Sequence, residues 1–177
     1  MKLLRHPQSA GGEGFVVEAE AARTPDGRLT LRYRVTGDIG GLRLPPPGDG
    51  ERTDELWRHT CFEAFVRAAG DGYYELNLAP SRQWAAYRLP AYRTGMAAAD
   101  VPAPRITAGR AEGGYELAAE ASLDGLGDLP RTAPWRLGLA AVLEDSAGRI
   151  SYWALAHAPG KPDFHHPDGF ALDLTDA

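Results

Sequence analysis

The feature that most constrains the fold is a pair of alternating stretches that flank a glycine-rich turn. Residues 61–66 and 73–78 each place an apolar side chain at every second position, which is typical of half-buried β-strands. The turn between them, residues 69–72, ends in Asp71-Gly72, a pair that favours a hairpin because both residues tolerate positive φ. The sequence therefore predicts an antiparallel hairpin with one apolar face.

The opposite face of this hairpin gathers carboxylate and amide side chains, and tryptophans stand near the strand ends. Carboxylates and amides hydrogen-bond the hydroxyl groups of a sugar, and aromatic rings pack against its apolar face. We therefore interpret this face as a binding surface for a small molecule. The candidate ligand-binding residues of this region are Trp57, Arg58, Thr60, Glu63, Glu75, Asn77, Ser81 and Trp84.

A closed internal network would explain the same pattern. In that alternative the two tryptophans belong to the core, and Glu63 pairs with Arg58 or Arg82. A third interpretation makes Glu63 and Glu75 the acid/base pair of a hydrolase, but the separation of two carboxylates cannot be read from sequence. We assign no catalytic residue and lean towards a protein that is not an enzyme.

Eight further stretches have the pattern of short strands, and glycine and proline, 21 and 14 residues of the 177, mark the turns between them. In the first hairpin, Glu18 and Glu20 are expected to face Arg32 and Arg34. The whole pattern predicts a single all-β domain over residues 1–177, with its core at about 12–175. We expect an antiparallel immunoglobulin-like or jelly-roll β-sandwich of about nine or ten strands. The eight stretches are residues 15–22, 29–36, 87–93, 105–110, 115–122, 135–144, 150–157 and 170–174.

Composition excludes several classes of partner. The formal net charge is −5 and there is no basic stripe, which argues against nucleic-acid binding. No apolar run approaches the roughly 18 residues of a membrane span. The single cysteine, Cys61, cannot form an internal disulfide and is expected to be an inert buried thiol. The first residues lack the apolar stretch of a secretory signal, so we expect a cytoplasmic protein.

Residues 156–168 form a second candidate region, with three histidines and two aspartates. A metal site there is disfavoured because His165 and His166 are adjacent and point in opposite directions in an extended chain. We predict no metal site. A structural loop and a loop that contributes to a pocket both remain open, and in the second case Lys161, Asp163 and His165 join the candidate ligand-binding residues.

Three segments resemble the bacterial DOMON-like family: residues 57–66 (WxxTCFEAFV), 73–84 (YYELNxxPSxxW) and 152–165 (YWALxHxxGKPDFH). The wider relatives of that family are heme-binding DOMON domains and family nine carbohydrate-binding modules. The resemblance implies an immunoglobulin-like β-sandwich that holds a heme or a sugar and performs no catalysis alone. It implies aromatic platforms at Trp57 and Trp84 and polar contacts at Glu63 and Asn77.

Two alternatives to a saccharide ligand follow from the same observations. Heme relatives use a methionine with a histidine as axial ligands, which would make Met96 with His157 or His165 the heme ligands and the protein an electron-transfer domain. A protein-interaction module would use a sheet edge or the Pro45–Pro47 loop. We predict a non-catalytic module that binds a small molecule, preferably a saccharide, and we commit to no cofactor, with heme as the possible one.

Overall fold

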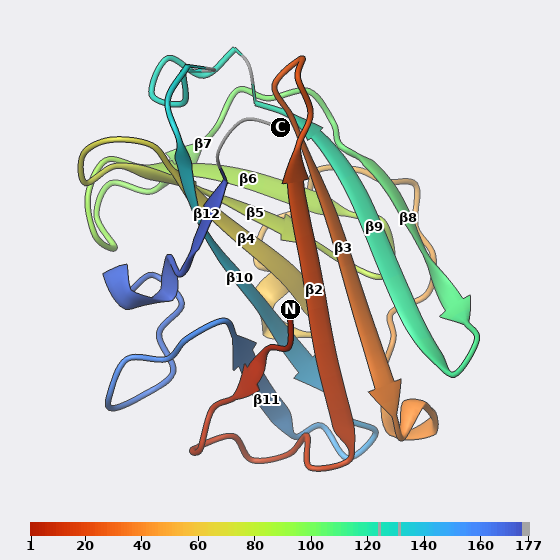
Figure 1. Ribbon diagram of the computed structural model, residues 1–177. Helices are drawn as coiled ribbons and strands as arrows, with labels where there is room; N and C mark the ends of the chain where they lie inside the picture. Colours follow the sequence, from red (N-terminus) through yellow and green to blue (C-terminus); the bar gives the residue numbers. More distant parts are fainter. Residues whose placement is uncertain (124, 131, 175–177) are drawn as a thin grey trace.

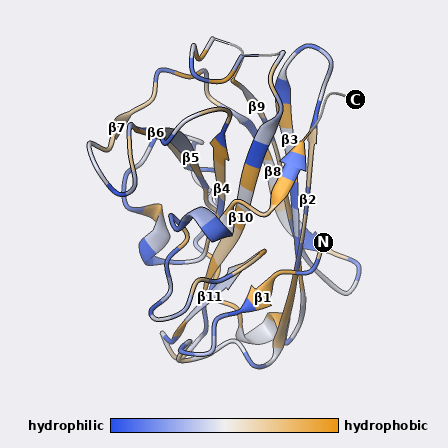
Figure 2. Cartoon of the chain, turned by 60° about the vertical axis from the view of Figure 1, so that its left-hand side comes forward, coloured by the Kyte–Doolittle hydropathy of each residue, from blue (hydrophilic) through white to orange (hydrophobic). Residues whose placement is uncertain are grey.

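The computed structural model describes residues 1–123, 125–130 and 132–174, which form two antiparallel β-sheets packed face to face (Figure 1). The smaller sheet lies in front in this view, and the larger sheet runs behind it at an angle. Along the strands, hydrophobic and hydrophilic residues follow one another (Figure 2). The antiparallel β-sandwich predicted from this alternation is confirmed.

The smaller sheet has the spatial order β2–β3–β9–β8. Its first hairpin pairs Glu18 with Arg34 and Glu20 with Arg32, as the alternation predicted. Arg32 also forms a 3.0 Å ion pair with Glu116 of the third strand, so the outer face of this sheet is a solvated charge network. The bounds are β2 (Phe15–Arg23), β3 (Arg28–Gly37), β9 (Gly114–Ser122) and β8 (Arg105–Ala111).

The larger sheet has the spatial order β1–β11–β10–β4–β5–β6–β7. A further short strand, β12, pairs with the opposite end of β10 from the part that pairs with β11. The bounds are β1 (Leu4–Arg5), β11 (Ile150–Ala154), β10 (Trp135–Glu144), β4 (Cys61–Arg67), β5 (Tyr73–Leu78), β6 (Trp84–Leu89), β7 (Ala97–Ala98) and β12 (Leu172–Leu174). Over the described residues, three single-turn 3₁₀ helices complete the elements: η1 (Ile39–Gly41), η2 (Leu56–Arg58) and η3 (Pro167–Gly169).

Several predicted strand boundaries differ from the structure. The stretch at 87–93 is the end of β6, which stops at Leu89 because Pro90 cannot donate to the sheet. The stretch at 150–157 ends at Ala154, and the last strand begins at Leu172. In the hairpin between β4 and β5, the left-handed position falls at Gly70, with φ of 86°, one residue before the predicted Asp71-Gly72 pair.

The main core lies between the two sheets. Leu31, Tyr33 and Val35 of β3 are almost completely buried and belong to the same apolar cluster as Leu137 and Leu139 of β10. The hydroxyl of Tyr33 donates a 2.7 Å hydrogen bond to the backbone oxygen of Glu63, which ties the smaller sheet to β4. Through this bond the core helps to fix the strand whose outward side chains form the candidate site.

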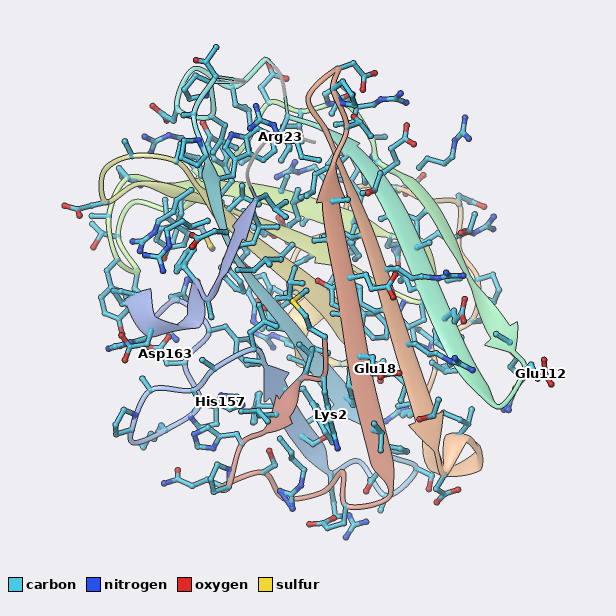
Figure 3. All side chains as sticks on the ribbon, in the orientation of Figure 1. Lys2, Glu18, Arg23, Glu112, His157 and Asp163 are labelled. Carbon is cyan, nitrogen blue, oxygen red and sulfur yellow. The ribbon has the colours of Figure 1, made fainter. Side chains whose placement is uncertain are left out.

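A second apolar cluster lies on the outer face of the larger sheet, and residues 155–171, here called the C-terminal loop, cover it. Phe164 and Phe170 of the loop pack against Phe65 and Tyr73 of the sheet. Figure 3 labels His157 and Asp163 of this loop on the side of the molecule opposite Glu112 at the β8–β9 turn. The larger sheet is thus covered on both faces, by the smaller sheet and by the loop.

No helix in the described part of the chain is long and apolar enough to cross a membrane.

Candidate functional site

The three polar residues predicted to share one face of the central hairpin do share it. The register of β4 with β5 pairs Glu63 with Asn77 and places Glu75 opposite Phe65. Glu63 and Glu75 are therefore diagonal neighbours on adjacent strands, close enough to interact through their side chains. The sequence produces this arrangement because Phe62, Ala64 and Val66 of β4 turn into the main core and leave the odd positions facing outward.

A pocket of about 410 Å³ lies over this face, between the larger sheet and the C-terminal loop. The sheet contributes Glu63 and Glu75 to its lining, and η2 contributes Trp57. The loop contributes Phe164 and His165. The full lining is Trp57, Glu63, Glu75, Leu89, Arg93, Met96, Val142, Tyr152, Pro162, Phe164 and His165.

The two carboxylates of the pocket are buried without full pairing. Glu63 is 3% exposed and Glu75 is 4% exposed. Neither Oε1 of Glu63 nor Oε2 of Glu75 has a hydrogen-bond partner among the described residues. Burial raises the pKa of both groups, and for Glu63 the neighbouring Glu75 charge raises the pKa further. Such groups are unusual in a folded protein, because burying an unpaired carboxylate is costly.

The remaining polar atoms of this face form a small network behind the pocket. Asn77 is fully buried, and its Nδ2 donates a 2.7 Å hydrogen bond to Oε1 of Glu75. The thiol of Cys61 lies 3.7 Å from Oδ1 of Asn77, and burial raises its pKa well above the ordinary value. Asn77 therefore orients Glu75 from behind, and Cys61 is a neutral buried thiol rather than a nucleophile.

His165 stands on the loop side of the pocket as a neutral side chain. Its Nδ1 lies 2.8 Å from the hydroxyl of Tyr73, and its Nε2 lies 3.9 Å from Oε2 of Glu75. Burial, followed by the charge of Arg93, lowers the pKa of His165 to about 4. At neutral pH the imidazole therefore carries no charge to compensate Glu75.

Asp163 fastens the loop to the segment after β6. Its Oδ1 accepts hydrogen bonds from Arg93, at 2.8 Å from Nη2 and 3.1 Å from Nε, and from the backbone nitrogen of His165 at 3.0 Å. The hydroxyl of Tyr92 donates to the other carboxylate oxygen. Arg93 has a positive φ of 50°, an uncommon backbone conformation for a residue with a side chain. Asp163 thus shapes the pocket without lining it.

Two predicted ligand-binding residues lie away from the pocket. Trp84 pairs with Leu78 in the register of β5 and β6, so its ring points into the main core, where Arg52 lies over it at 5.5 Å. Its predicted place at the rim of the polar face was wrong. Ser81 is buried in the turn between β5 and β6 and bonds Gln83 at 2.9 Å. Both residues have structural partners, and neither lines the pocket.

Three other predicted residues are also outside the pocket lining. The Thr60 hydroxyl donates to the backbone oxygen of Arg43 at 2.7 Å and accepts from the backbone nitrogen of Glu144 at 3.1 Å. Arg58 is exposed and pairs with Glu55 at 2.7 Å, not with Glu63 as the closed-network alternative supposed. Lys161 is exposed on the C-terminal loop.

Of the residues predicted as heme ligands, Met96 and His157 do not converge, and His165 has other partners. Met96 is 50% exposed and lines the pocket, whereas Nε2 of His157 lies 2.8 Å from the backbone oxygen of Leu4 and its ring packs edge-on against His6. His165, the alternative partner of Met96, has its two ring nitrogens directed at Tyr73 and Glu75. These residues do not fit an axial pair. Within the described ranges, no group of three or more histidine, cysteine or acidic side chains could hold a metal ion.

Several pocket residues were not predicted. Tyr152 and Phe164 lie inside the 152–165 segment that carries the family resemblance, so that segment held a signal for both. Arg93 follows the end of β6 in an irregular segment, and no pattern in the sequence marks it. The other lining residues not predicted are Leu89, Val142 and Pro162.

No family model and no curated protein matches the chain, but solved structures do. A candidate carbohydrate-binding protein from Bacteroides uniformis aligns with a TM-score of 0.65 and 16% identity, over 99% of this chain and 87% of its own. A family 9 carbohydrate-binding module from Caldicellulosiruptor kristjanssonii aligns in two complexes. The complex with cellotriose has a TM-score of 0.56 and 11% identity, over 98% of this chain and 81% of the module. The complex with glucose has a TM-score of 0.55 and 10% identity, over 99% of this chain and 83% of the module.

These neighbours share the fold of this chain. At such low identity the likeness establishes the β-sandwich architecture and leaves the ligand to be argued from the site itself. The site combines carboxylate oxygens at its base with aromatic rings on its walls. This arrangement can bind a small molecule that presents both polar groups and apolar faces.

Proposed function

We propose that the protein is a non-catalytic module that binds a saccharide in the pocket under the C-terminal loop. The observation that carries the proposal is the lining of this pocket. Rings of Trp57, Tyr152 and Phe164 line the same cavity as Glu63 and Glu75, and one carboxylate oxygen of each acid has no hydrogen-bond partner among the described residues. A sugar needs both kinds of surface, because its hydroxyl groups seek hydrogen-bond acceptors and its C–H faces pack on aromatic rings.

The size of the pocket limits the ligand. A volume of about 410 Å³ is near the lower end of the range for small-molecule sites, roughly 300 to 1,000 Å³. We infer a ligand of one or two sugar units rather than a polymer lying along the sheet. The likeness in fold to modules solved with glucose and cellotriose supports this class of ligand.

We also propose that the chain is a member of the bacterial DOMON-like family. The support is that the three segments with the family resemblance all contribute to the pocket: Trp57 and Glu63 from the first, Glu75 from the second, and Phe164 and His165 from the third. In this proposal each of the three family segments supplies part of the ligand site.

Calorimetric titration with a panel of monosaccharides and disaccharides tests the proposal. We expect at least one sugar to bind with a dissociation constant in roughly the micromolar to millimolar range. Trp57→Ala should weaken that binding by about tenfold or more, because an aromatic platform is a typical centre of binding energy. The matched control is Val16→Ala, a truncation of an exposed side chain on the smaller sheet. If no sugar binds, or if Trp57→Ala binds as well as the natural protein, the proposal fails.

A further inference from the structure

Two acidic groups at the base of the pocket lack the counter-charges that buried carboxylates normally have. Glu63 and Glu75 are both more than nine-tenths buried and both line the cavity, and one carboxylate oxygen of each has no hydrogen-bond partner among the described residues. A buried acid is usually paired with a cation or bonded on every oxygen. The base of the pocket therefore holds acidic oxygens that no described group of the protein bonds.

The charged and titratable neighbours do not supply the missing cation. Burial raises the pKa of Glu75 and the charge of Arg93 lowers it in part, but the guanidinium of Arg93 is bonded to Asp163, with both Nη2 and Nε on one carboxylate oxygen. His165 lies 3.9 Å from Glu75, but at neutral pH it is uncharged. Among the described residues, no basic side chain forms an ion pair with Glu63; Arg58 pairs with Glu55, and Arg43 pairs with Glu144.

The walls of the pocket favour an organic cation. The faces of aromatic rings attract positive charge, and Trp57, Tyr152 and Phe164 all line the cavity. A divalent metal ion would need more oxygen or nitrogen ligands than converge here, because no described cluster of three or more such side chains is present. The carboxylates of Glu63 and Glu75, together with the aromatic rings of the walls, are the groups that bind a protonated amine.

We propose that the ligand carries a protonated amine that lies between the carboxylates of Glu63 and Glu75, and that the saccharide is an amino sugar. The amine would donate hydrogen bonds to the two carboxylates, while the sugar ring would pack against the aromatic walls. This inference rests on the proposed saccharide function for its sugar part only. The amine part follows from the two carboxylates alone.

The test compares amino sugars with two neutral relatives. The natural protein is titrated at about pH 6.5, where an aliphatic amine is protonated, with glucosamine, galactosamine and mannosamine. Each is matched by the parent sugar with a hydroxyl in place of the amine and by the N-acetylated sugar, whose nitrogen is uncharged. Propane-1,3-diamine serves as an amine without a sugar ring. We expect at least one amino sugar to bind about tenfold or more tightly than both of its neutral relatives.

Glu63→Gln and Glu75→Gln keep the shape of the side chains and remove the charge. We expect each to abolish the preference for the amino sugar, with thermal unfolding used to verify that the variants are folded. Glu116→Gln is the matched control, since Glu116 lies on the outer face of the smaller sheet and pairs with Arg32. The control should keep the preference.

The outcomes separate this inference from the proposed function. If neutral and amino sugars bind equally tightly, the proposal that the ligand carries an amine is wrong, and the proposal that the protein binds a saccharide stands. If the diamine binds the natural protein but not Glu63→Gln, and no sugar binds more tightly than the diamine, the proposal of an amine ligand stands. The proposal of a saccharide ligand is then wrong. Binding of none of these compounds overturns both.

Discussion

At the scale of single residues, the site depends on two side chains that destabilise the protein in which they lie. In the folded state, burial raises the pKa values of Glu63 and Glu75 above the ordinary value of 4.5. In the unfolded chain both groups are expected to have ordinary pKa values. Between the ordinary and the raised pKa, the folded protein binds more protons than the unfolded chain, so stability falls as pH rises through this window.

Glu63→Gln should therefore stabilise the protein above this window. The amide resembles the neutral acid and cannot acquire the buried charge. At about pH 8 we expect the free energy of unfolding to rise by about 1 kcal/mol or more, and the gain to shrink as the pH is lowered towards about 5. Urea denaturation at the two pH values measures this difference. The groups around the site that can also titrate or carry charge are unchanged in the variant: Tyr33, Cys61, Tyr73, Glu75, Tyr87, Arg93, Asp163 and His165. A variant that is less stable than the natural protein at about pH 8 would contradict the argument.

The carboxylates of Glu63 and Glu75 should also release protons when an amine binds. If the carboxylate pair retains a proton in the empty pocket, then an ammonium group that enters must displace it. We expect proton release on binding at about pH 6, and no release with a neutral sugar. Calorimetry in two buffers of different ionisation enthalpy measures the number of protons. Equal apparent enthalpies in both buffers would show that the pair is already ionised.

Residue positions show where sequence reasoning succeeds and where it stops. The shared face of Glu63, Glu75 and Asn77 could be predicted because period-two alternation fixes the side of every residue in a paired strand. Trp84 was placed wrongly because both faces of β6 carry apolar side chains, with Arg88 as the one charged residue of the strand, so its alternation does not show which face is buried in the core. Arg93 follows the strand, where no period applies and a positive φ turns the side chain into the pocket.

At the scale of elements, the C-terminal loop is what turns an open sheet face into a pocket. Its position depends on Asp163, whose carboxylate joins the loop to Arg93 and Tyr92. The side chain of Asp163 is 18% exposed, so these charge-assisted bonds are partly shielded from water. Alternation alone could not predict this arrangement, because the loop has no repeating pattern and its place is set by contacts distant in sequence.

Asp163→Asn should loosen the loop while leaving the sandwich intact. Loss of the ion pair with Arg93 should raise amide hydrogen exchange in residues 159–169 and weaken ligand binding by about threefold to thirtyfold, with little change in exchange of β4 and β10. Exchange monitored by mass spectrometry measures the first effect. Asp173→Asn is the matched control. Asp173 lies on β12 and forms an exposed 3.1 Å ion pair with Arg136 of β10. Equal loosening in both variants would refute the assigned role.

At the scale of the whole molecule, one core joins the two sheets. The cluster between them takes buried residues from β2, β3 and β9 on one side and from β4, β5 and β10 on the other. Neither sheet can keep its inner face out of water without the other. The single domain expected from the sequence remains a prediction, and this shared core is its physical basis.

Leu137→Ala should lower the stability of both sheets together. Leu137 is fully buried on β10, and its truncation leaves a cavity that costs about 2–5 kcal/mol. We expect one unfolding transition, with coincident curves from tryptophan fluorescence and circular dichroism, shifted to lower denaturant. Leu4→Ala, at a side chain that is 54% exposed, is the control and should change little. Two separated transitions would contradict a single cooperative unit.

The attachment of the C-terminal loop to β10 has a consequence for how such proteins diversify. The backbone nitrogen of Leu155 bonds the oxygen of Leu139, and Leu172 pairs with Leu137, so the loop leaves and rejoins the sheet two residues apart on one strand. A segment whose ends are fixed so close together can be replaced, lengthened or exchanged with little effect on the strands that anchor it. New specificities could therefore be grafted onto this scaffold by exchanging residues 156–171 alone, while the acidic base beneath stays as it is.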